Sequence, residues 1–584
     1  MGVAALAAAA AQAQAVPNAP RPPTREEVER PQPRDVVRRP RLTVDSNVER
    51  APCALEDPAY ASIRVTLTGV DFGGLKGLSP EAMRPAYEPF LGAEQPISIV
   101  CQIRDRAATI LRRAGYVAAV EIPEQHIAGG RLRLEALMAK LVAVRVRGDA
   151  GRSERLIARY LGKLTGRDAF NRIEAERYLL LARGLPGYDV RLTLRSAGGA
   201  RGEVIGEVVV EREPGAFEAS IQNFGSHALG PWGAMVRGEL YGVTGLGDRT
   251  SLAAYSTADF NEQYTLQLGH EFRVGSEGMT LGARLTWAEA RPDLDDGGLD
   301  VRARTAFATI EAAYPLRLSQ AGSLRLKGGF DMVDQRVRLN DLPLSRDRLR
   351  IAFARLEFDR MDRASVNGVG GYSLARPRRR VAATVEARQG LGILGASPDC
   401  GPGFLRCVAP GAVPPSRLEG EASATVLRVE ALGEYRPRPK LTLALALRAQ
   451  ATRDSLLSFE QFAAGNYTVG RGYAPGALLG DRGAGVQAEL RYGSVVPKSA
   501  GAFTAEPYVF LDLARVAEAG RIPVLVGPRS LASGGAGVRA SIGDRAHIDA
   551  VLAIPLQRAG LQTRRSDPRF LVSLTTRLRP WSRK

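Results

Sequence analysis

The sequence predicts an all-β transmembrane barrel of about 16 antiparallel strands, preceded by two α+β domains. Three observations lead to this fold class. Between residues 61 and 213, strand and helix patterns alternate in two consecutive units of similar layout. From residue 214 onward helical periodicity vanishes, and runs of roughly ten to fourteen residues alternate apolar with polar side chains. After the first fifteen positions no run of eighteen uncharged apolar residues occurs, so a membrane crossing would have to be made by strands.

The N-terminal segment is predicted to be the apolar part of a cleaved export signal. Residues 1–15 are almost entirely Ala and end in Ala13-Gln14-Ala15, which matches an A-x-A cleavage site. The alternative is an Ala-rich disordered tail. A basic segment normally precedes the apolar run, so its absence indicates that the real translation start lies upstream. Residues 16–60 are rich in Pro, Arg and Glu and are interpreted as a linker or a weak, short helix.

Two units with the order strand, two helices, two strands follow the linker. In the first, at 61–140, apolar residues recur at helical spacing and a glycine stands where that helix should end: Ile103, Ala107, Ile110, Leu111 and then Gly115. In the second, at 141–213, strands are predicted at 141–148, 190–196 and 203–212, and helices at 153–164 and 169–185. The units are an internal repeat of architecture without obvious sequence identity.

Residues 214–584 are predicted to form the barrel. Sixteen segments alternate apolar with polar residues: 215–223, 232–242, 248–257, 263–273, 278–289, 303–314, 322–336, 347–360, 378–390, 420–435, 440–453, 482–496, 504–515, 530–542, 545–557 and 569–580. A soluble sandwich with one polar face is the alternative, but it seldom needs so many long strands. Short turns on one side and long loops on the other, as at 391–419 and 454–481, are typical of an outer-membrane barrel.

The charge pattern agrees with a water-filled lumen. The formal net charge is +18, from 80 Lys and Arg against 62 Asp and Glu. The basic residues are spread over the whole length instead of clustering on one patch, so nucleic-acid binding is not predicted. Scattered charge at alternate strand positions describes a polar barrel lumen or solvated faces.

Four cysteines are predicted to form two disulfides, Cys53–Cys101 and Cys400–Cys407, because an even count in an exported protein suggests oxidation. Neither spacing suits zinc, so no metal and no cofactor are expected. The four histidines stand in separate segments without a Ser–acid partner, which argues against an enzyme: His126, His227, His270 and His547. No GxxxxGK[ST] motif for nucleotide binding occurs.

Short motifs occur in a fixed order along the chain. The first unit contains Gly115-Tyr116 followed by Pro123, Gln125, Gly130 and Leu132, and the second contains Leu185-Pro186-Gly187 followed by Asp189-Val190. The early barrel contains Gly245-Leu246-Gly247-Asp248, and the loop at 454–481 contains Arg471-Gly472-Tyr473 followed by Gly480-Asp481-Arg482-Gly483. A later strand contains Phe510-Leu511-Asp512-Leu513-Ala514. In this order the motifs resemble those of the TpsB transporters of two-partner secretion (ShlB/FhaC/HecB type), within the Omp85 superfamily. The likeness covers almost the whole chain from about Cys53.

The resemblance assigns a role to the loop at 454–481. In the family this loop folds back into the lumen and its arginine meets the aspartate of the FxDxG strand, which implies an Arg471–Asp512 pair. An arginine offers a planar fork of donors to a carboxylate, so such a pair is physically reasonable in a confined site. Without the resemblance, Arg471 would be interpreted as part of a solvated surface loop. The pattern departs at Gly470, which is an additional residue before Arg471, and at Ala514, which replaces the last glycine.

The resemblance also implies domain names and a location. The α+β units correspond to POTRA domain 1 at 61–140, with its family motif from Gly115 to Gly130, and POTRA domain 2 at 141–213. Both would stand in the periplasm of a Gram-negative bacterium. Residues 214–584 would form a monomeric barrel that contacts outer-membrane lipid and is inserted by the barrel assembly machinery. The plug helix common in the family is not expected here, because prolines interrupt residues 17–40.

The implied function is translocation of a large partner protein. Such a pore recognises a secreted TpsA-type exoprotein (an adhesin, haemolysin or toxin) and passes it to the cell surface without nucleotide. The alternative is an outer-membrane assembly factor of the same superfamily. Known assembly factors carry three or five POTRA domains, whereas this chain has room for two.

Overall fold

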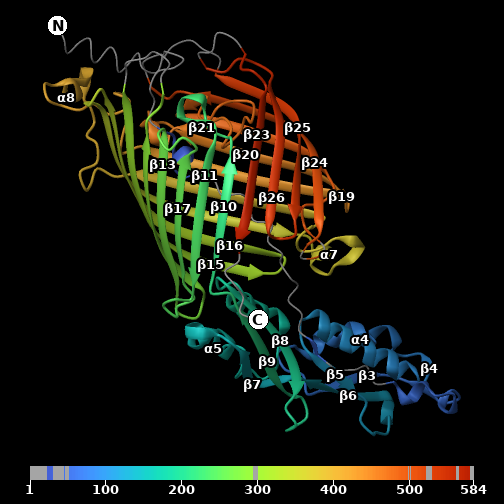
Figure 1. Cartoon of the computed structure of the whole chain (residues 1–584). Helices are drawn as coiled ribbons and strands as arrows, with labels where there is room; N and C mark the ends of the chain where they lie inside the picture. Colours follow the sequence, from blue (N-terminus) through green and yellow to red (C-terminus); the bar gives the residue numbers. More distant parts are fainter. Residues whose placement is uncertain are drawn as a thin grey trace.

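Two small α+β domains and one large barrel make up the described part of the chain, as Figure 1 shows. The structure is a computed structural model that describes residues 23–29, 45–46, 52–293, 300–497, 499, 501–520, 529–560 and 565–578. The export signal predicted at 1–15 lies outside these residues. No helix in the described ranges has the length and apolar character of a membrane span.

The first domain packs one long helix on a small sheet. The sheet has the order β3-β6-β5, formed by β3 (Gly69–Gly73), β5 (Ala118–Glu121) and β6 (Arg131–Met138). A separate pair joins β2 (Arg64–Thr66) to β4 (Glu94–Pro96), and the helices are α3 (Arg84–Tyr87) and α4 (Ile99–Arg113). Ile103, Ala107 and Leu111 of α4 are fully buried, because their spacing of four places them on one face, in one core with Leu132 and Leu134 of the sheet.

The second domain repeats this arrangement. It contains β7 (Lys140–Gly148), α5 (Glu154–Gly162), α6 (Arg172–Arg183), β8 (Tyr188–Ser196) and β9 (Glu203–Arg212). Its sheet has the order β1-β8-β9-β7, in which β1 (Asp45–Ser46), from the linker, pairs in parallel with β8. Apolar residues of α5, α6 and β9, such as Ile157, Leu179 and Val208, form its core.

Sixteen antiparallel strands close the barrel, which confirms the predicted fold class. They are β10 (Gly215–Gln222), β11 (Gly233–Tyr241), β12 (Arg249–Thr257), β13 (Gln263–Val274), β14 (Met279–Ala290), β15 (Val301–Ser319), β16 (Gly322–Leu339), β17 (Leu342–Met361), β18 (Arg379–Gly390), β19 (Thr425–Arg438), β20 (Leu441–Thr452), β23 (Arg482–Tyr492), β24 (Phe503–Ala517), β25 (Ser530–Ile542), β26 (Ala546–Pro555) and β27 (Arg569–Leu578). The ring closes where β10 pairs with β27, from Phe217↔Leu578 to Gln222↔Ser573.

Strands β15, β16 and β17 are longer than the predicted ranges 303–314, 322–336 and 347–360. The pairing register shifts between Pro315 and Arg317, and again between Val337 and Arg338. A bulge interrupts the alternation of side chains while the backbone ladder continues. The alternating pattern therefore ends before the strand does.

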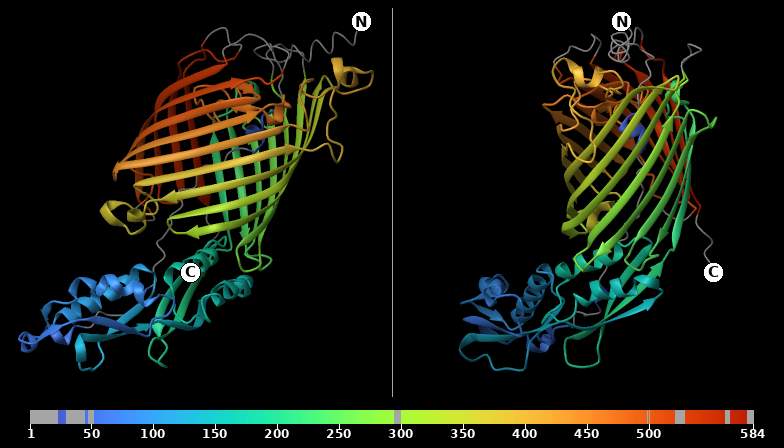
Figure 2. Two further views of the ribbon diagram at one scale, coloured as in Figure 1. Left: turned by 180° about the vertical axis from the view of Figure 1, so that it is seen from behind. Right: turned by 90° about the vertical axis from the view of Figure 1, so that its left-hand side faces the viewer.

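The two ends of the barrel differ. The second domain adjoins the end at which β10 begins: Arg152 Nη1 donates to the Val243 carbonyl at 2.8 Å, and the Gln320 backbone N–H donates to Glu176 Oε1 at 2.8 Å. We refer to this as the domain end and to the opposite one as the loop end (Figure 2). The short helix α7 (Arg363–Val366) lies in a loop at the domain end, and α8 (Leu405–Val408) lies in a loop at the loop end.

Among the described residues, two segments lie inside the lumen. One is residues 453–481, here called the lumenal loop, which contains β21 (Phe462–Ala464) and β22 (Leu478–Gly480). The other is α2 (Arg25–Glu29), the short blue helix inside the barrel in Figure 1. The expectation that prolines rule out a lumenal helix was wrong, because Pro22 and Pro23 precede α2 and Pro31 follows it, which leaves a proline-free segment long enough for one turn.

Candidate functional site

Glycines of β23 allow the lumenal loop to lie against the barrel wall. A Cβ atom on Gly483 would lie 2.3 Å from Phe462 Cδ1, and one on Gly485 would lie 2.8 Å from Val469 Cγ2. Phe462 and Val469 are almost fully buried, and they share a core with Tyr473 and wall residues. Larger side chains on this part of β23 would push the loop away from the wall.

Two carboxylates of the wall hold Arg471. Its Nε and Nη2 donate to Asp512 Oδ2 and Oδ1 at 3.0 and 2.7 Å, and its backbone N–H donates to Asp512 Oδ2 at 2.9 Å. The remaining Nη1 donates to Glu489 Oε1 at 2.7 Å. Asp512, on β24, is fully buried. The structure thus brings Arg471 and Asp512 together and adds Glu489 of β23, which sequence reasoning missed because it is one of many charged residues at alternate strand positions.

Electrostatics keep Arg471 charged in this enclosed site. Burial by itself lowers the pKa of Arg471, but hydrogen bonds to Asp512 and the charges of Asp512 and Glu489 outweigh it, so the pKa lies above its ordinary value. The guanidinium carbon also lies 3.7 Å from the centroid of the Phe510 ring, a cation–π contact. A buried charge with this many partners is strongly destabilised when one partner is removed.

The rest of the Arg-Gly-Tyr motif fixes the loop tip. The Tyr473 hydroxyl lies 2.6 Å from the Gln557 carbonyl and 2.8 Å from the Ala532 carbonyl. Gly472 donates its N–H to Ser533 Oγ at 3.3 Å, and a Cβ on Gly472 would lie 2.8 Å from Ser533 Cβ. The additional Gly470 has a φ of +119°. It therefore adopts a conformation that larger residues disfavour, and Arg471 still reaches Asp512.

A second group of ion pairs, around Glu460, holds the first part of the lumenal loop, and sequence reasoning missed it. Glu460 accepts two hydrogen bonds from Arg388 of β18, both at 3.0 Å, and one from Arg428 of β19, also at 3.0 Å. Arg388 is buried and also pairs with Asp331 at 2.9 Å. Glu460 and Arg388 lie 72 residues apart and belong to none of the motifs quoted above, so no local signal could have paired them.

Asp481, from the Gly480–Gly483 motif, anchors the end of the loop. It is fully buried, accepts N–H donors from Leu456 at 3.0 Å and Ala519 at 2.8 Å, and pairs with Arg417. Arg417 also binds Glu518 at 2.7 Å. Burial, together with the negative charge of Asp481, raises the pKa of Glu518 to about 7, although Arg417 acts in the opposite direction.

The lumenal helix α2 is packed and hydrogen-bonded to the wall. Val28 is fully buried in a cluster with Phe307 and Phe459, and Glu26 pairs with Arg448 of β20. Its first turn has a capping box, in which Thr24 N–H donates to Glu27 Oε2 at 2.8 Å and Glu27 N–H to Thr24 Oγ1 at 3.3 Å. The sequence Thr-x-x-Glu was therefore the available signal for this helix.

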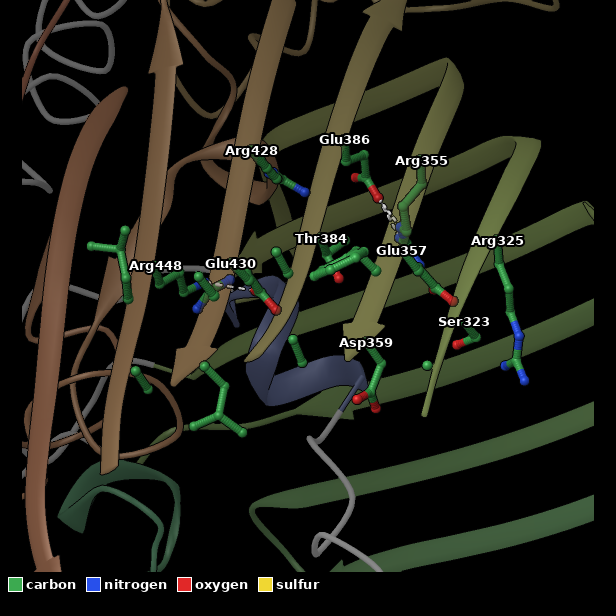
Figure 3. Close-up of a pocket in the computed structure, with 18 of the residues that line it drawn as sticks. Ser323, Arg325, Arg355, Glu357, Asp359, Thr384, Glu386, Arg428, Glu430 and Arg448 are labelled. Atoms are coloured by element: carbon green, nitrogen blue, oxygen red, sulfur yellow. Dashed lines mark hydrogen bonds and ion pairs between the residues drawn. The ribbon is translucent and has the colours of Figure 1, made fainter. Parts of the chain in front are cut away.

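Below the loop and α2, a cavity of about 1280 Å³ opens toward the second domain. Figure 3 shows that side chains of both signs point into it from β16 to β20, beside α2: Arg325, Arg355, Arg428, Arg448, Glu357, Glu386, Glu430 and Asp359. Residues of the second domain, such as Leu180 and Arg183, complete its lining. The cavity is a chamber with charges of both signs in its lining, suited to water and to a polar chain.

The motif residues of the first domain have contacts of a structural kind. The Gly115 carbonyl accepts from Arg172 N–H at 2.7 Å at the start of α6, and Tyr116 forms a bridge with Asn171, so both join the two domains. Gln125 Nε2 donates to the Arg133 carbonyl at 2.7 Å and to the Pro123 carbonyl at 3.2 Å. Gly130 has a φ of +76°, and its carbonyl accepts from Thr68 N–H at 2.8 Å.

The structure contains both disulfides, Cys53–Cys101 and Cys400–Cys407. The first connects the chain entering the first domain to α4. The second ties Cys400 to Cys407 of α8 at the loop end. Among the described residues no group of three or more His, Cys, Asp or Glu could hold a metal ion.

Comparison with known proteins identifies two family matches. Residues 205–540 match the haemolysin secretion/activation protein family ShlB/FhaC/HecB, and residues 65–138 match the ShlB-type POTRA domain. The first match covers more than half of the chain. A search of the curated proteins finds no significant match.

Solved structures share the fold. CdiB from Escherichia coli has 16% sequence identity and a TM-score of 0.70, with 91% of this chain and 93% of that chain covered. CdiB from Acinetobacter baumannii has 16% identity and a TM-score of 0.62, with 92% and 95% covered. BamA from Haemophilus ducreyi, lacking POTRA domains 1–3, has 13% identity and a TM-score of 0.51, with 88% and 100% covered.

Proposed function

Because the chain belongs to the haemolysin secretion/activation protein family (ShlB/FhaC/HecB), we propose that it is an outer-membrane pore that passes a large secreted exoprotein from the periplasm to the cell surface. In this proposal the two N-terminal domains stand in the periplasm and receive the exoprotein unfolded. The loop end of the barrel faces the exterior. No nucleotide is consumed, and folding of the exoprotein outside the cell gives transport its direction.

The observation that carries the proposal is a lumen closed largely by exchangeable polar contacts. The lumenal loop is held by ion pairs at Arg471, Glu460 and Asp481, and α2 is held in part by the pair of Glu26 with Arg448. Water or a passing polypeptide can replace such contacts one by one, because each donor and acceptor can find a new partner. These replaceable contacts support the idea that the lumenal loop and α2 act as a gate.

The charged chamber at the domain end supports passage of an extended chain. Basic and acidic side chains face the same space, so a segment of either charge meets both attraction and repulsion. A lumen that binds no single charge strongly suits a cargo of varied sequence.

The N-terminal domains offer sheet edges at which the exoprotein could be captured. In the second domain, β7 forms the outer edge of the sheet β1-β8-β9-β7. An extended segment can add to such an edge through main-chain hydrogen bonds, which provides affinity with little dependence on sequence. A segment bound at this edge would lie on the second domain, which adjoins the domain end of the barrel.

The proposal is tested by deleting the gene and comparing secreted and surface proteins. Loss of one large exoprotein, with other outer-membrane barrels at normal levels, is the expected result. Complementation with Arg471→Ala or Asp512→Ala should restore the barrel but not full secretion. Arg380→Ala is the matched control, because Arg380 pairs with Asp359 in the lumen at 2.7 Å without touching the lumenal loop. A general loss of outer-membrane barrels would instead identify the chain as an assembly factor.

A further inference from the structure

A groove lies on the outer, membrane-facing wall of the barrel, in the half nearer the domain end. It has a volume of about 860 Å³ and crosses β18, β19, β20, β23 and β24. These strands are the yellow to orange strands in front in the left view of Figure 2. A volume of this size falls within the range of small-molecule sites.

The groove exists because small residues alternate with large ones in one row of the wall. The pairing register places Gly433, Leu445, Ala488 and Leu511 side by side across four strands. Leu445 and Leu511 are exposed and stand out from the wall. A Cβ on Gly433 would have only the Leu445 carbonyl within reach, at 4.0 Å. The floor at Gly433 is therefore open space between apolar walls.

The end of the groove nearest the second domain carries positive charge. Arg379, the first residue of β18, is exposed and lines the groove, and its guanidinium carbon lies 5.5 Å from the centroid of the Tyr435 ring. Its neighbour Arg380 points into the lumen and binds Asp359, whereas Arg379 forms no ion pair with a described carboxylate. Arg378, Arg438 and Lys440 are also exposed in the same part of the barrel rim.

We propose that this groove binds one anionic diacyl phospholipid from the periplasm-facing leaflet of the outer membrane. One acyl chain would lie over Gly433 and the other over Ala488, on the two sides of Leu445. The phosphate would bind Arg379, whose planar fork of donors matches phosphate oxygens. The inference rests on the proposed function only for the placement of the barrel in the outer membrane.

Position and charge both select this occupant. An outward face at mid-wall meets hydrocarbon, so an apolar groove there is filled by lipid chains. Tyrosine beside arginine is typical of the membrane–water boundary, where a headgroup lies. Basic residues clustered at this boundary favour an anionic headgroup over a neutral one. The groove therefore combines both parts of a phospholipid at their required depths.

The test measures lipid that stays bound to the purified full-length chain. The protein is solubilised in a maltoside detergent, mixed with phosphatidylglycerol, washed, and examined by native mass spectrometry. We expect one retained phosphatidylglycerol per chain and about tenfold less phosphatidylcholine. Both lipids carry a phosphate, but the choline cation of phosphatidylcholine is repelled by the basic residues of the rim. Arg379→Glu, which removes the phosphate partner, should lower retention about tenfold. Gly433→Leu, which fills the floor, should also lower it.

Two control variants should leave retention unchanged. Gly328→Leu also adds a leucine to the outer wall, but on β16, away from the groove. The leucine fits there because a Cβ on Gly328 would meet only the Phe353 carbonyl, at 3.8 Å. Arg317→Glu reverses an exposed charge on β15. Unboiled gel migration shows that each variant remains a folded barrel.

Three results would overturn the proposal. Retention unchanged in both groove variants, or equal retention of phosphatidylcholine or lipid A, would show that the groove does not select this phospholipid. A change in oligomeric mass in Gly433→Leu, with retention unaffected, would make the groove an interface between two copies. Secretion is measured separately, so a failed transport assay leaves the lipid result standing.

Discussion

Removing the guanidinium of Arg471 should release the lumenal loop from the wall. Arg471→Ala deletes two side-chain hydrogen bonds to Asp512 and one to Glu489, and leaves Asp512, which is fully buried, with the backbone N–H of residue 471 as a donor. Breaking one side of a buried pair typically costs about 3–5 kcal/mol. At about 1.4 kcal/mol per factor of ten, the released state should become about 10² to 4 × 10³ times more populated.

Hydrogen exchange measures this change directly. Amides of the loop, such as those of Gly472 and Tyr473, exchange through opening of the loop, so their rate follows the population of the released state. We expect exchange across 465–480 to accelerate about a hundredfold in Arg471→Ala, with α6 unchanged. Arg471→Lys should fall between, because an ammonium cannot reproduce the fork of three donors.

A matched control distinguishes loss of the Arg471–Asp512 pair from the loss of any lumenal positive charge. Arg380→Ala removes a lumenal arginine whose partner is Asp359, and should leave loop exchange unaltered. Equal exchange in wild type and Arg471→Ala, with the barrel intact, would refute the idea that this pair holds the loop.

Four further results are expected. Val28→Asp should expel α2 and raise conductance in planar bilayers, because it places an unpaired charge at a fully buried position; Val369→Asp, at an exposed site, should not. Replacing Cys53 and Cys101 with serine should destabilise the first domain by about 2–4 kcal/mol, measured as proteolysis across α4 in urea; unchanged cleavage would argue against the linkage. The pKa of Glu518 is about 7 in the folded protein and about 4.3 in the unfolded chain, so between these pH values the folded state binds the proton more tightly. Protection of the lumenal loop from exchange should therefore fall as the pH rises from about 4.3 to about 7. Glu518→Gln should abolish this pH dependence. Finally, the effects of Arg471→Ala and Val28→Asp on loop exchange should not add, whereas additive values would mean that loop and helix open independently.

The barrel was predictable because its pattern is local. Alternation such as Leu443, Leu445 and Leu447 on one side of β20 sets which face meets lipid, and it needs no knowledge of the partner strand. The ends of β15 to β17 were not predictable in this way. Bulges at Pro315 and at Val337 break the alternation, and only the paired strand shows that the ladder continues.

The site was predictable only where a motif carried it. Arg471 and Asp512 were paired by the order of their motifs, since 41 residues separate them and distance cannot be read from spacing. Glu489, Arg388 and Glu460 resemble many other charged residues at lumen-facing positions. Which of these meet depends on how far each strand is displaced along its neighbours around the ring, and that displacement is a property of the closed barrel.

The closure of the lumen is a joint property of α2 and the lumenal loop. Val28 of α2 and Phe459 of the loop lie in one buried cluster, and Phe459 also contacts the Phe307 ring of the wall, with centroids 5.7 Å apart. The adjacent Glu460 is the residue that Arg388 holds. A movement that frees Glu460 therefore withdraws the apolar surface on which α2 rests, and loss of α2 exposes Phe459 to water. Each element stabilises the closed position of the other, so a cargo chain that displaces one of them lowers the free energy required to displace the second.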